Sequence, residues 1–248
     1  MEIIKINNLR KEYKDVIAVD NLNLEIHQGE LFSLLGVNGA GKTTTIKMLS
    51  GLTKPTSGDA FIYDYSINKD IDKIKELIDI SMQETAIGRK LTVEENIVFY
   101  AKLSGQTKEE VEQTKEYVYR NFNLDKVKNK TASKLSGGWQ RKLSIALALV
   151  KKPKILFLDE PTLGLDVISR RELWHTIREL KTKMTIILTT HYMEEAEALS
   201  DRVGIIKDGK LMFVGTIDEL YKKTNKDNVE DAFIEIVSGG DLNEEITF

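Results

Sequence analysis

Alternating and continuous apolar runs along the chain predict the elements of an α/β fold. Apolar residues alternate with polar ones at Ile4 and Ile6 and again over 22–26, which indicates half-buried strands near the N-terminus. A mostly apolar run predicts a buried strand at 31–35, and the core is expected to resume with strands at 154–158, 184–189 and 203–207. A helix is expected from Lys42 to about Ser50.

The segment 85–150 has a different, helical pattern. Thr-Val-Glu-Glu at 92–95 and Thr-Lys-Glu-Glu at 107–110 are capping-box sequences, and each one opens a polar-faced helix. A third helix is expected from residue 136 or 137 through 150. The pattern therefore predicts a helical subdomain inserted into an α/β core.

The C-terminal part of the chain returns to the core and then becomes polar. Asp208-Gly209 separates two strand-like runs, which predicts a hairpin. The segment after Tyr221 is expected to lie at the periphery. No internal repeat is found, so the organisation predicted is a single domain over 1–223 with a short helical and polar tail over 224–248.

Composition removes several classes of function. The chain has 248 residues and a formal net charge of −3, and it shows no basic stripe of the kind that binds nucleic acid. It contains no Cys, which excludes disulfides, thiolate metal sites and Cys nucleophiles. The longest apolar run, 145–150, is far shorter than the ~20 residues that span a bilayer, so a membrane role is expected only through a partner. The first residues do not have the pattern of a signal peptide.

A phosphate-binding loop is the first chemical signal. Residues 36–43 match G-x-x-x-x-G-K-[ST], follow a predicted strand and open a predicted helix. Lys42 is expected to reach the β- and γ-phosphates of ATP and Thr43 to ligate Mg²⁺, while backbone N–H groups hold the phosphate oxygens. The expected nucleotide-binding residues here are Gly36, Asn38, Gly39, Ala40, Gly41, Lys42, Thr43 and Thr44. The fold class expected is α/β, a P-loop NTPase core with a mixed sheet, an antiparallel β subdomain and the helical insertion.

Two adjacent carboxylates, Asp159 and Glu160, end an apolar strand. Taken alone, such a pair is often only a solvated acidic turn. Downstream of a phosphate-binding loop, Asp159 is expected to orient Mg²⁺ and Glu160 to polarise the attacking water as general base.

A Leu-Ser-Gly-Gly turn at 135–138 adds a second anion-binding helix start. Ser136 offers a hydroxyl, and Gly137 and Gly138 expose their N–H groups. In isolation the turn would be an ordinary helix N-cap. Its continuation over 141–149 into the Asp-Glu strand, together with the phosphate-binding loop, resembles the ATP-binding cassette ATPases, the motor subunits of ABC transporters. The resemblance implies that this turn meets the ATP bound by the opposite protomer of a head-to-tail dimer.

Four smaller matches follow the same family order. The resemblance implies that the Tyr13 ring stacks on adenine and that Gln83 contacts Mg²⁺ or water and begins the coupling segment. It implies that Asp166, in the loop 163–166, crosses the dimer interface and that His191 senses the γ-phosphate.

The resemblance spans roughly 2–220 and departs from the family pattern at two positions. Trp139 stands where many members have Gln, and Asp64 stands where a Gly is frequent. The tail at 228–235 looks like the terminal helix of the exporter branch, whose cassettes pair with separate membrane proteins. The resemblance thus implies ATP and Mg²⁺ as cofactors, a second cassette and a membrane permease as partners, and a location at the cytoplasmic face of the cell membrane. The surface toward the permease is expected near 83–90 and the helical subdomain.

A soluble cassette that serves as an assembly module, as in iron–sulfur cluster building, is the alternative. The absence of a long coiled coil argues against a DNA-repair cassette, and a single cassette argues against a translation factor. Residues 68–71 and 225–228 both miss the N-K-x-D pattern of GTPases.

Overall fold

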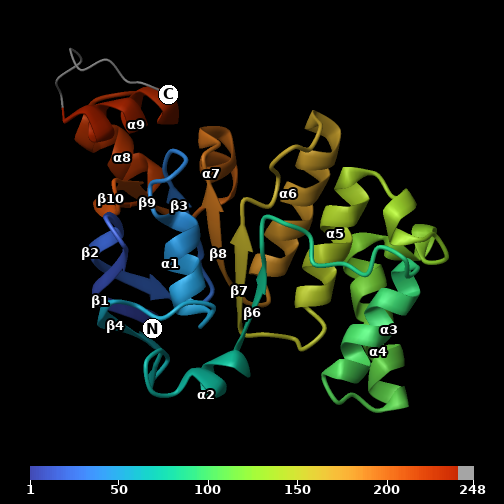
Figure 1. Ribbon diagram of the computed structural model, residues 1–248. Helices are drawn as coiled ribbons and strands as arrows, with labels where there is room; N and C mark the ends of the chain where they lie inside the picture. The colour runs from blue at the N-terminus through green and yellow to red at the C-terminus, as the bar shows by residue number, and fades with distance from the viewer. Residues whose placement is uncertain (240–248) are drawn as a thin grey trace. The chain divides into compact units, whose positions relative to one another are not determined.

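A computed structural model describes residues 1–239, which fall into two compact units (Figure 1). The first unit combines residues 1–74 with the chain from Ile187 onward, and the second comprises Lys75–Ile186. The predicted helical subdomain lies within the second unit. The last nine residues of the predicted tail, 240–248, lie outside the described residues.

The first unit contains two groups of strands. The elements of its N-terminal part are β1 (Glu2–Tyr13), β2 (Val16–His27), β3 (Leu31–Leu35), α1 (Lys42–Leu49), β4 (Ser57–Ile62), β5 (Tyr65–Ser66) and α2 (Ile71–Lys75). Its C-terminal part contains β8 (Thr185–Thr190), α7 (Met193–Leu199), β9 (Arg202–Lys207), β10 (Lys210–Gly215), α8 (Ile217–Thr224) and α9 (Val229–Ser238). The strand β8 contains the boundary between the units, and α2 ends one residue beyond the other boundary.

The first group is the predicted antiparallel β subdomain, with strand order β2-β1-β4-β5. Ile4 pairs with Ile26 and Ile6 with Leu24 across β1 and β2. All four side chains are buried, because apolar residues that alternate along both strands fall on the same face of the sheet. The alternation that predicted these strands therefore also fixes their register.

The second group has the order β10-β9-β3-β8 and is mixed. The strands β3 and β9 are parallel, with Leu34 opposite Gly204, whereas β9 and β10 form an antiparallel hairpin. The hairpin turn has positive φ at both central residues, 49° at Asp208 and 76° at Gly209, as a type I′ turn requires. The predicted hairpin is confirmed.

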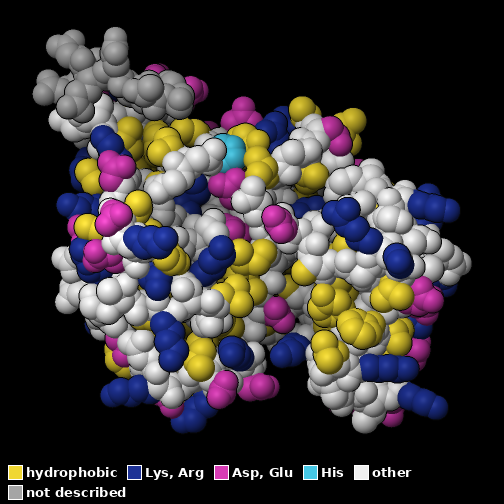
Figure 2. Space-filling model, viewed as in Figure 1, with side chains coloured by type: hydrophobic (Ala, Val, Ile, Leu, Met, Phe, Trp, Pro, Cys, Tyr) yellow, Lys and Arg dark blue, Asp and Glu magenta, His cyan; other side chains and the backbone are white. Residues whose placement is uncertain are grey.

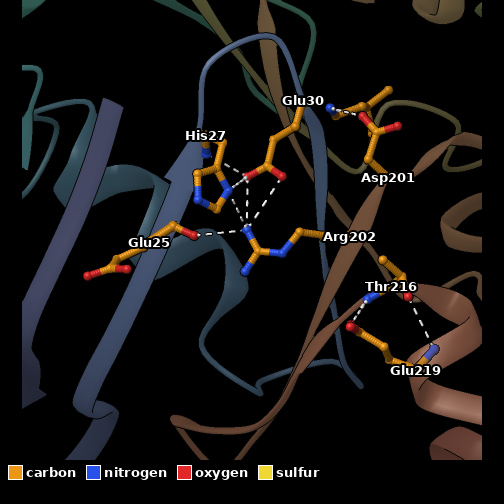
Figure 3. A network of polar contacts seen from close by, with 8 residues as sticks. Glu25, His27, Glu30, Asp201, Arg202, Thr216 and Glu219 are labelled. Atoms are coloured by element: carbon orange, nitrogen blue, oxygen red, sulfur yellow. Dashed lines mark hydrogen bonds and ion pairs between the residues drawn. The ribbon is translucent and has the colours of Figure 1, made fainter. Parts of the chain in front are cut away.

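A polar network ties the start of β9 to β2 and β3 (Figure 3). One guanidinium nitrogen of Arg202 donates to the backbone carbonyl of Glu25 at 3.2 Å and to the carboxylate of Glu30 at 3.2 Å. The same nitrogen lies 3.0 Å from Nδ1 of His27. Asp201 accepts from the backbone N–H of Leu31 at 2.9 Å. The network satisfies the nearly buried Glu30 carboxylate, which would otherwise be costly to remove from water.

The tail was expected to be helical and polar and to lie at the periphery; α9 forms within it and has one buried face. Val229, Ala232 and Phe233 on α9 are buried in one cluster with residues of β3, β9 and β10. Apolar positions spaced three and four apart place these side chains on one helix face, and six of the ten residues of α9 are apolar, so the helix packs through that face. The first unit is therefore completed by a helix near the end of the chain.

The second unit combines a short stretch of sheet with the helical subdomain. Its elements are β6 (Ile78–Ser81), α3 (Val93–Leu103), α4 (Lys108–Phe122), the 3₁₀ helices at Leu124–Val127 and Ala132–Lys134, α5 (Gly137–Ala148), β7 (Ile155–Asp159) and α6 (Val167–Lys181). The strands β6 and β7 are parallel, with Ile80 opposite Phe157. Every residue of β7 is buried, which explains its continuous apolar sequence.

Both predicted capping boxes are present. The Thr92 side chain accepts from the backbone N–H of Glu95 at the start of α3, and Thr107 accepts from that of Glu110 at the start of α4. Among residues 1–239, none of the helices combines the length and the apolar content needed to cross a bilayer.

Candidate functional site

The predicted phosphate-binding loop connects β3 to α1 in the first unit, and its geometry requires glycine at two positions. A Cβ on Gly36 would lie 2.5 Å from the carbonyl oxygen of Ile206. Gly41, at the N-cap of α1, has φ of 108°, and a Cβ there would lie 2.4 Å from the carbonyl oxygen of Ala18. Only glycine accepts both the close approach and the positive φ.

Backbone hydrogen bonds fix the loop against neighbouring strands of the same unit. The N–H of Gly209, in the β9–β10 turn, donates to the carbonyl of Ala40 at 3.0 Å. The N–H of Gly36 donates to the carbonyl of Thr190 at 3.3 Å. Because His191 directly follows Thr190, the structure brings this predicted γ-phosphate sensor to the beginning of the loop.

Lys42 folds back over the loop that precedes it. Its Nζ donates to the carbonyls of Gly36 at 2.7 Å and Val37 at 3.0 Å, and the residue is only 4% exposed. The ammonium group is therefore held directly at the loop whose N–H groups are expected to receive phosphate. Of the other predicted loop residues, Asn38 and Gly39 are exposed, Ala40 is buried, and Thr43 and Thr44 are half-buried in the first turn of α1.

Tyr13 lies at the tip of the β1–β2 hairpin, opposite Val16. Its side chain is 45% exposed, and the ammonium of Lys11 lies 4.8 Å from the ring centroid. Further along the same hairpin, Ala18 is the residue in close contact with the phosphate-binding loop. An exposed aromatic face near this loop suits stacking on a base, and the adenine contact stays a prediction.

In the second unit, the two predicted carboxylates end β7. Asp159 is fully buried and Glu160 is 8% exposed. Glu160 has φ of 45°, a conformation that is uncommon for non-glycine residues and is further disfavoured before a proline such as Pro161. Such a backbone persists only where the surroundings impose it, and strained residues of this kind gather at functional sites.

Arg141, which sequence reasoning did not single out, joins the segments that carry these predicted residues. The guanidinium of this buried residue donates to the carbonyls of Asp159 at 2.7 Å and Pro161 at 2.8 Å, on either side of Glu160. It also donates to the carbonyls of Met82 and Gln83. One cation on α5 thus fixes the backbone at both the end of β7 and the start of the coupling segment. The sequence signal for Arg141 was a cation near the start of a mostly apolar helix.

Gln83 follows β6 and is exposed. The strand ends at Ser81, so Met82 belongs to the connection. The backbone of Gln83 is fixed by Arg141, whereas its side chain is open to solvent. Its predicted contact with Mg²⁺ or water stays a prediction.

The Leu-Ser-Gly-Gly turn begins α5, with Ser136 at the N-cap position. The Ser136 side chain makes no capping hydrogen bond, so the turn is not the ordinary N-cap that its residue type alone suggests. Gly138 is buried, and a Cβ there would lie 2.8 Å from the hydroxyl of Ser169. The next residue, Trp139, has the ammonium of Lys142 at 4.9 Å from its ring centroid.

Asp166 is the N-cap of α6. Its carboxylate accepts from the N–H groups of Ile168 at 3.0 Å and Ser169 at 2.9 Å and from the Ser169 hydroxyl at 2.7 Å. The hydroxyl contact, followed by the backbone contacts, lowers the pKa of this carboxyl. Asp166 therefore has a structural task within its own chain, and its contact across a dimer interface stays a prediction.

A comparison of helix starts separates two helices from the others. Among the described α-helices of eight residues or more, five have an N-cap side chain that accepts from the first turn: α3, α4, α6, α8 and α9. The two without such a bond are α1, at the phosphate-binding loop, and α5, at the Leu-Ser-Gly-Gly turn. The shorter α7 also lacks one. Uncapped N–H groups and the helix dipole together favour an anion.

The expected metal is compatible with the donor chemistry of these residues. Among residues 1–239, no group of three or more His, Asp or Glu side chains could hold a metal ion by itself. Nucleotide-bound Mg²⁺ needs no such group, because phosphates and waters supply most of its oxygen ligands. The hydroxyl of Thr43, the carboxylate of Asp159 and the amide oxygen of Gln83 are oxygen donors of the type that Mg²⁺ prefers.

Comparison with known proteins assigns the chain to a family. The family model described as "ABC transporter" matches residues 19–163, more than half of the chain. The chain belongs to the ABC transporter family. By this membership it is an ATP-binding cassette, the ATPase domain of such proteins.

Three similar proteins extend the match. The chain is 44% identical to ABC transporter A family member 7 of Dictyostelium discoideum, over 88% of this chain and 26% of that protein. It is 42% identical to the human phospholipid-transporting ATPase ABCA3, over 86% of this chain and 13% of that protein. A solved dimeric cassette in a post-hydrolysis state, bound to ADP and Pi, superposes with a TM-score of 0.77 at 27% identity, over 86% of this chain and 98% of that one. The chain thus spans about a quarter or less of the length of these curated relatives.

Proposed function

We propose that this cassette binds and hydrolyses MgATP as the cytosolic motor of an efflux system. Two copies pair head to tail around two ATP molecules, and the pair drives export through a separate membrane subunit. The observation that carries the proposal is the pair of uncapped helix starts, α1 and α5, in a chain whose other long helices are capped. Each presents backbone N–H groups for phosphate, and a composite site needs two such starts from different protomers.

Each predicted residue has a distinct role at the phosphates. Lys42 neutralises charge on the β- and γ-phosphates, since its ammonium already lies at the loop carbonyls. Glu160 accepts a proton from the attacking water, and the constrained backbone around it holds its carboxylate in place. Thr43, Asp159 and Gln83 would hold Mg²⁺, which neutralises phosphate charge when it is bound.

The head-to-tail dimer is supported by the likeness to a solved cassette that is dimeric and bound to ADP and Pi. Apolar side chains beside Asp166 also support it. Val167 is 59% and Ile168 is 73% exposed, so two adjacent aliphatic side chains face solvent at this helix start. Burial against a second copy would remove this apolar surface from water.

The contact with a membrane subunit is assigned to the helical part of the second unit and the segment 83–90. On α3, Phe99 is 54% and Leu103 is 73% exposed, and Figure 2 shows hydrophobic side chains gathered over this region. Exposed apolar side chains of this kind mark contact sites. The cassette would then lie at the cytoplasmic face of the membrane. The relatives are named as transporters, which supports a role in transport and not in soluble assembly. One of them is named for phospholipids, which supports a lipid as the exported cargo.

Substitution of the general base tests the catalytic part. Glu160→Gln keeps the shape of the side chain and removes its basicity, so ATP binding should persist while turnover falls by at least ~100-fold. The measurements are nucleotide binding by fluorescence titration and phosphate release at saturating MgATP. Light scattering should show dimers of the variant at saturating MgATP. Unchanged turnover would contradict the assignment of Glu160.

Mixing two inactive variants tests the shared site. Lys42→Ala disables the phosphate-binding loop, and Ser136→Glu places a charge where phosphate is expected, so each variant alone should be inactive. A mixed head-to-tail dimer contains one intact site, formed by the loop of one protomer and the Leu-Ser-Gly-Gly turn of the other. An equal mixture should therefore recover about a quarter of the wild-type rate, because half of the dimers are mixed and each has one of two sites. No recovery would argue for sites built within single protomers.

A further inference from the structure

Two neighbouring loops of the second unit carry a set of exposed cations, called here the basic surface. Its members are Arg89, Lys90, Lys126, Lys128, Lys130 and Lys134. None of the six forms an ion pair with a residue that the structure describes. By contrast, Lys115 and Lys142 in the same unit pair with Glu94 and Glu172. The positive charge of the basic surface is therefore not neutralised by the residues that the structure describes.

Backbone hydrogen bonds hold the two loops together. The N–H of Ser133 donates to the carbonyl of Arg89 at 3.0 Å, and the N–H of Val93 donates to that of Lys130 at 3.1 Å. A β-bridge joins Thr92 and Thr131 between these bonds. Cations from two distant parts of the sequence are thus fixed beside one another, and Figure 2 shows Lys and Arg side chains on this part of the second unit.

The charge is segregated in the sequence as well. From residue 126 to residue 134 the chain has four Lys residues and no Asp or Glu, although the whole chain carries a net charge of −3. The nearby carboxylates do not cancel it. Glu94 pairs with Lys115, and Glu95 accepts from Thr92 in the capping box, which leaves Asp125 as the exposed anion next to the surface.

We infer that the basic surface binds the anionic phospholipid headgroups of the membrane leaflet that faces the cassette. Six exposed cations spread over two loops match an extended anionic surface, whereas a single small anion requires convergent and partly buried donors. Arg89 and Lys90 end the segment 83–90, so the basic surface lies beside the region assigned to the membrane subunit. The inference rests on the proposed function, which places this region near a bilayer.

Vesicle binding of the full chain tests the inference. Wild-type protein should co-sediment with vesicles of 30% phosphatidylserine in phosphatidylcholine but not with pure phosphatidylcholine vesicles, and 0.5 M salt should release it because screening weakens the attraction. Each cation near such a surface raises the partition coefficient by roughly fivefold. The triple variant Lys126→Gln, Lys128→Gln, Lys130→Gln should therefore bind at least ~10-fold more weakly.

A matched control separates a local surface from net charge. Lys102→Gln, Lys108→Gln, Lys151→Gln makes the same change in net charge at the other end of the helical region, and its vesicle binding should stay within about twofold of wild type. Equal losses in the two triple variants would overturn the inference, and so would absent wild-type binding. Binding to polyglutamate but not to vesicles would overturn it in favour of an acidic protein partner.

ATP turnover, measured on the same samples, separates this inference from the proposed function. Both triple variants should hydrolyse ATP at the wild-type rate in solution, because none of the substituted residues belongs to the nucleotide site. Vesicle binding without ATP turnover in the wild-type protein would refute the proposed motor and leave the lipid contact standing. Normal ATP turnover without vesicle binding would refute the lipid contact and leave the proposed motor standing.

Discussion

Replacement of Arg141 by Met should separate the assembly of the catalytic end of the cassette from nucleotide binding. Met keeps the length and the apolar volume of the side chain and removes the cation and all of its donors. The carbonyls of Asp159 and Pro161 then lose their partner on either side of Glu160, and the carbonyls of Met82 and Gln83 lose theirs at the start of the coupling segment.

The size of the effect follows from these contacts. A hydrogen bond from a charged donor contributes about 1.5–3 kcal/mol, and a buried carbonyl left without a partner costs about 1–3 kcal/mol. Removing the cation also removes the cost of burying it, which offsets part of the loss. The expected net decrease in the free energy of unfolding is about 3 kcal/mol, a large part of the ~5–15 kcal/mol typical of a domain. The urea midpoint should fall by about 1 M.

Catalysis should respond differently from binding. The phosphate-binding loop belongs to the other unit and has its own hydrogen bonds, so the Kd for ATP should stay within about twofold of the wild-type value. The kcat should fall by tenfold or more, because the backbone of Glu160 and Gln83 is no longer fixed. Arg141→Lys should restore part of kcat, since its ammonium can reach some of the same carbonyls.

Arg171→Met is the matched control for this experiment. Arg171 is exposed on α6 of the same unit, so its replacement should change neither the stability nor kcat. A loss below 1 kcal/mol for Arg141→Met, or a Kd that rises as kcat falls, would refute the reasoning.

Three further predictions concern stability and the phosphate-binding loop. Burial raises the pKa of Asp79 to about 6, so its ionised form destabilises the fold. The free energy of unfolding therefore falls as the pH rises from about 4 through 6. Asp79→Asn should raise the free energy of unfolding by about 2 kcal/mol at pH 7.5 and by little at pH 4, as urea titrations at the two pH values would show. Phe233→Ala should cost about 3–4 kcal/mol in the same assay, because the ring is only 4% exposed within its cluster; a loss below 1 kcal/mol would mean that α9 is dispensable. Gly41→Ala should weaken ATP binding at least ~10-fold, because the added Cβ meets the Ala18 carbonyl. Gly39 has positive φ but open space around it, so Gly39→Ala should cost only about 1 kcal/mol in the free energy of unfolding. Equal losses of ATP affinity for the two variants in a nucleotide titration would contradict the steric argument.

Local rules were sufficient for most of the elements. Alternation located β1 and β2, mostly apolar runs located β3, β7, β8 and β9 within a residue or two, and turn chemistry located the β9–β10 hairpin. The capping boxes at Thr92 and Thr107 marked the exact starts of two helices, because this signal is contained in four consecutive residues. The family match over 19–163 confirms the α/β cassette expected from the motifs.

The features that sequence reasoning missed depend on contacts between distant residues. Arg141 could be read as part of a family match, but the four carbonyls it reaches belong to two segments, 82–83 and 159–161, that only the fold brings together. The tail was judged by its polar content, and the burial of Phe233 depends on a partner surface made by other strands. The positive φ of Glu160 has no sequence signature at all, since glutamate is not a residue that favours it.

The division of the chain has a consequence for the order of events on the ribosome. The second unit is continuous in sequence, whereas the first is split between the beginning and the end of the described chain. At about 5–20 residues per second, synthesis needs on the order of ten seconds to pass from the first half of the split unit to the second. During that interval β3 has neither of its neighbours β9 and β8, and the cluster that α9 closes is still open to solvent. The nascent β3 therefore lacks a partner strand on either side during that interval, and a chain released before α9 would leave this apolar cluster incompletely covered.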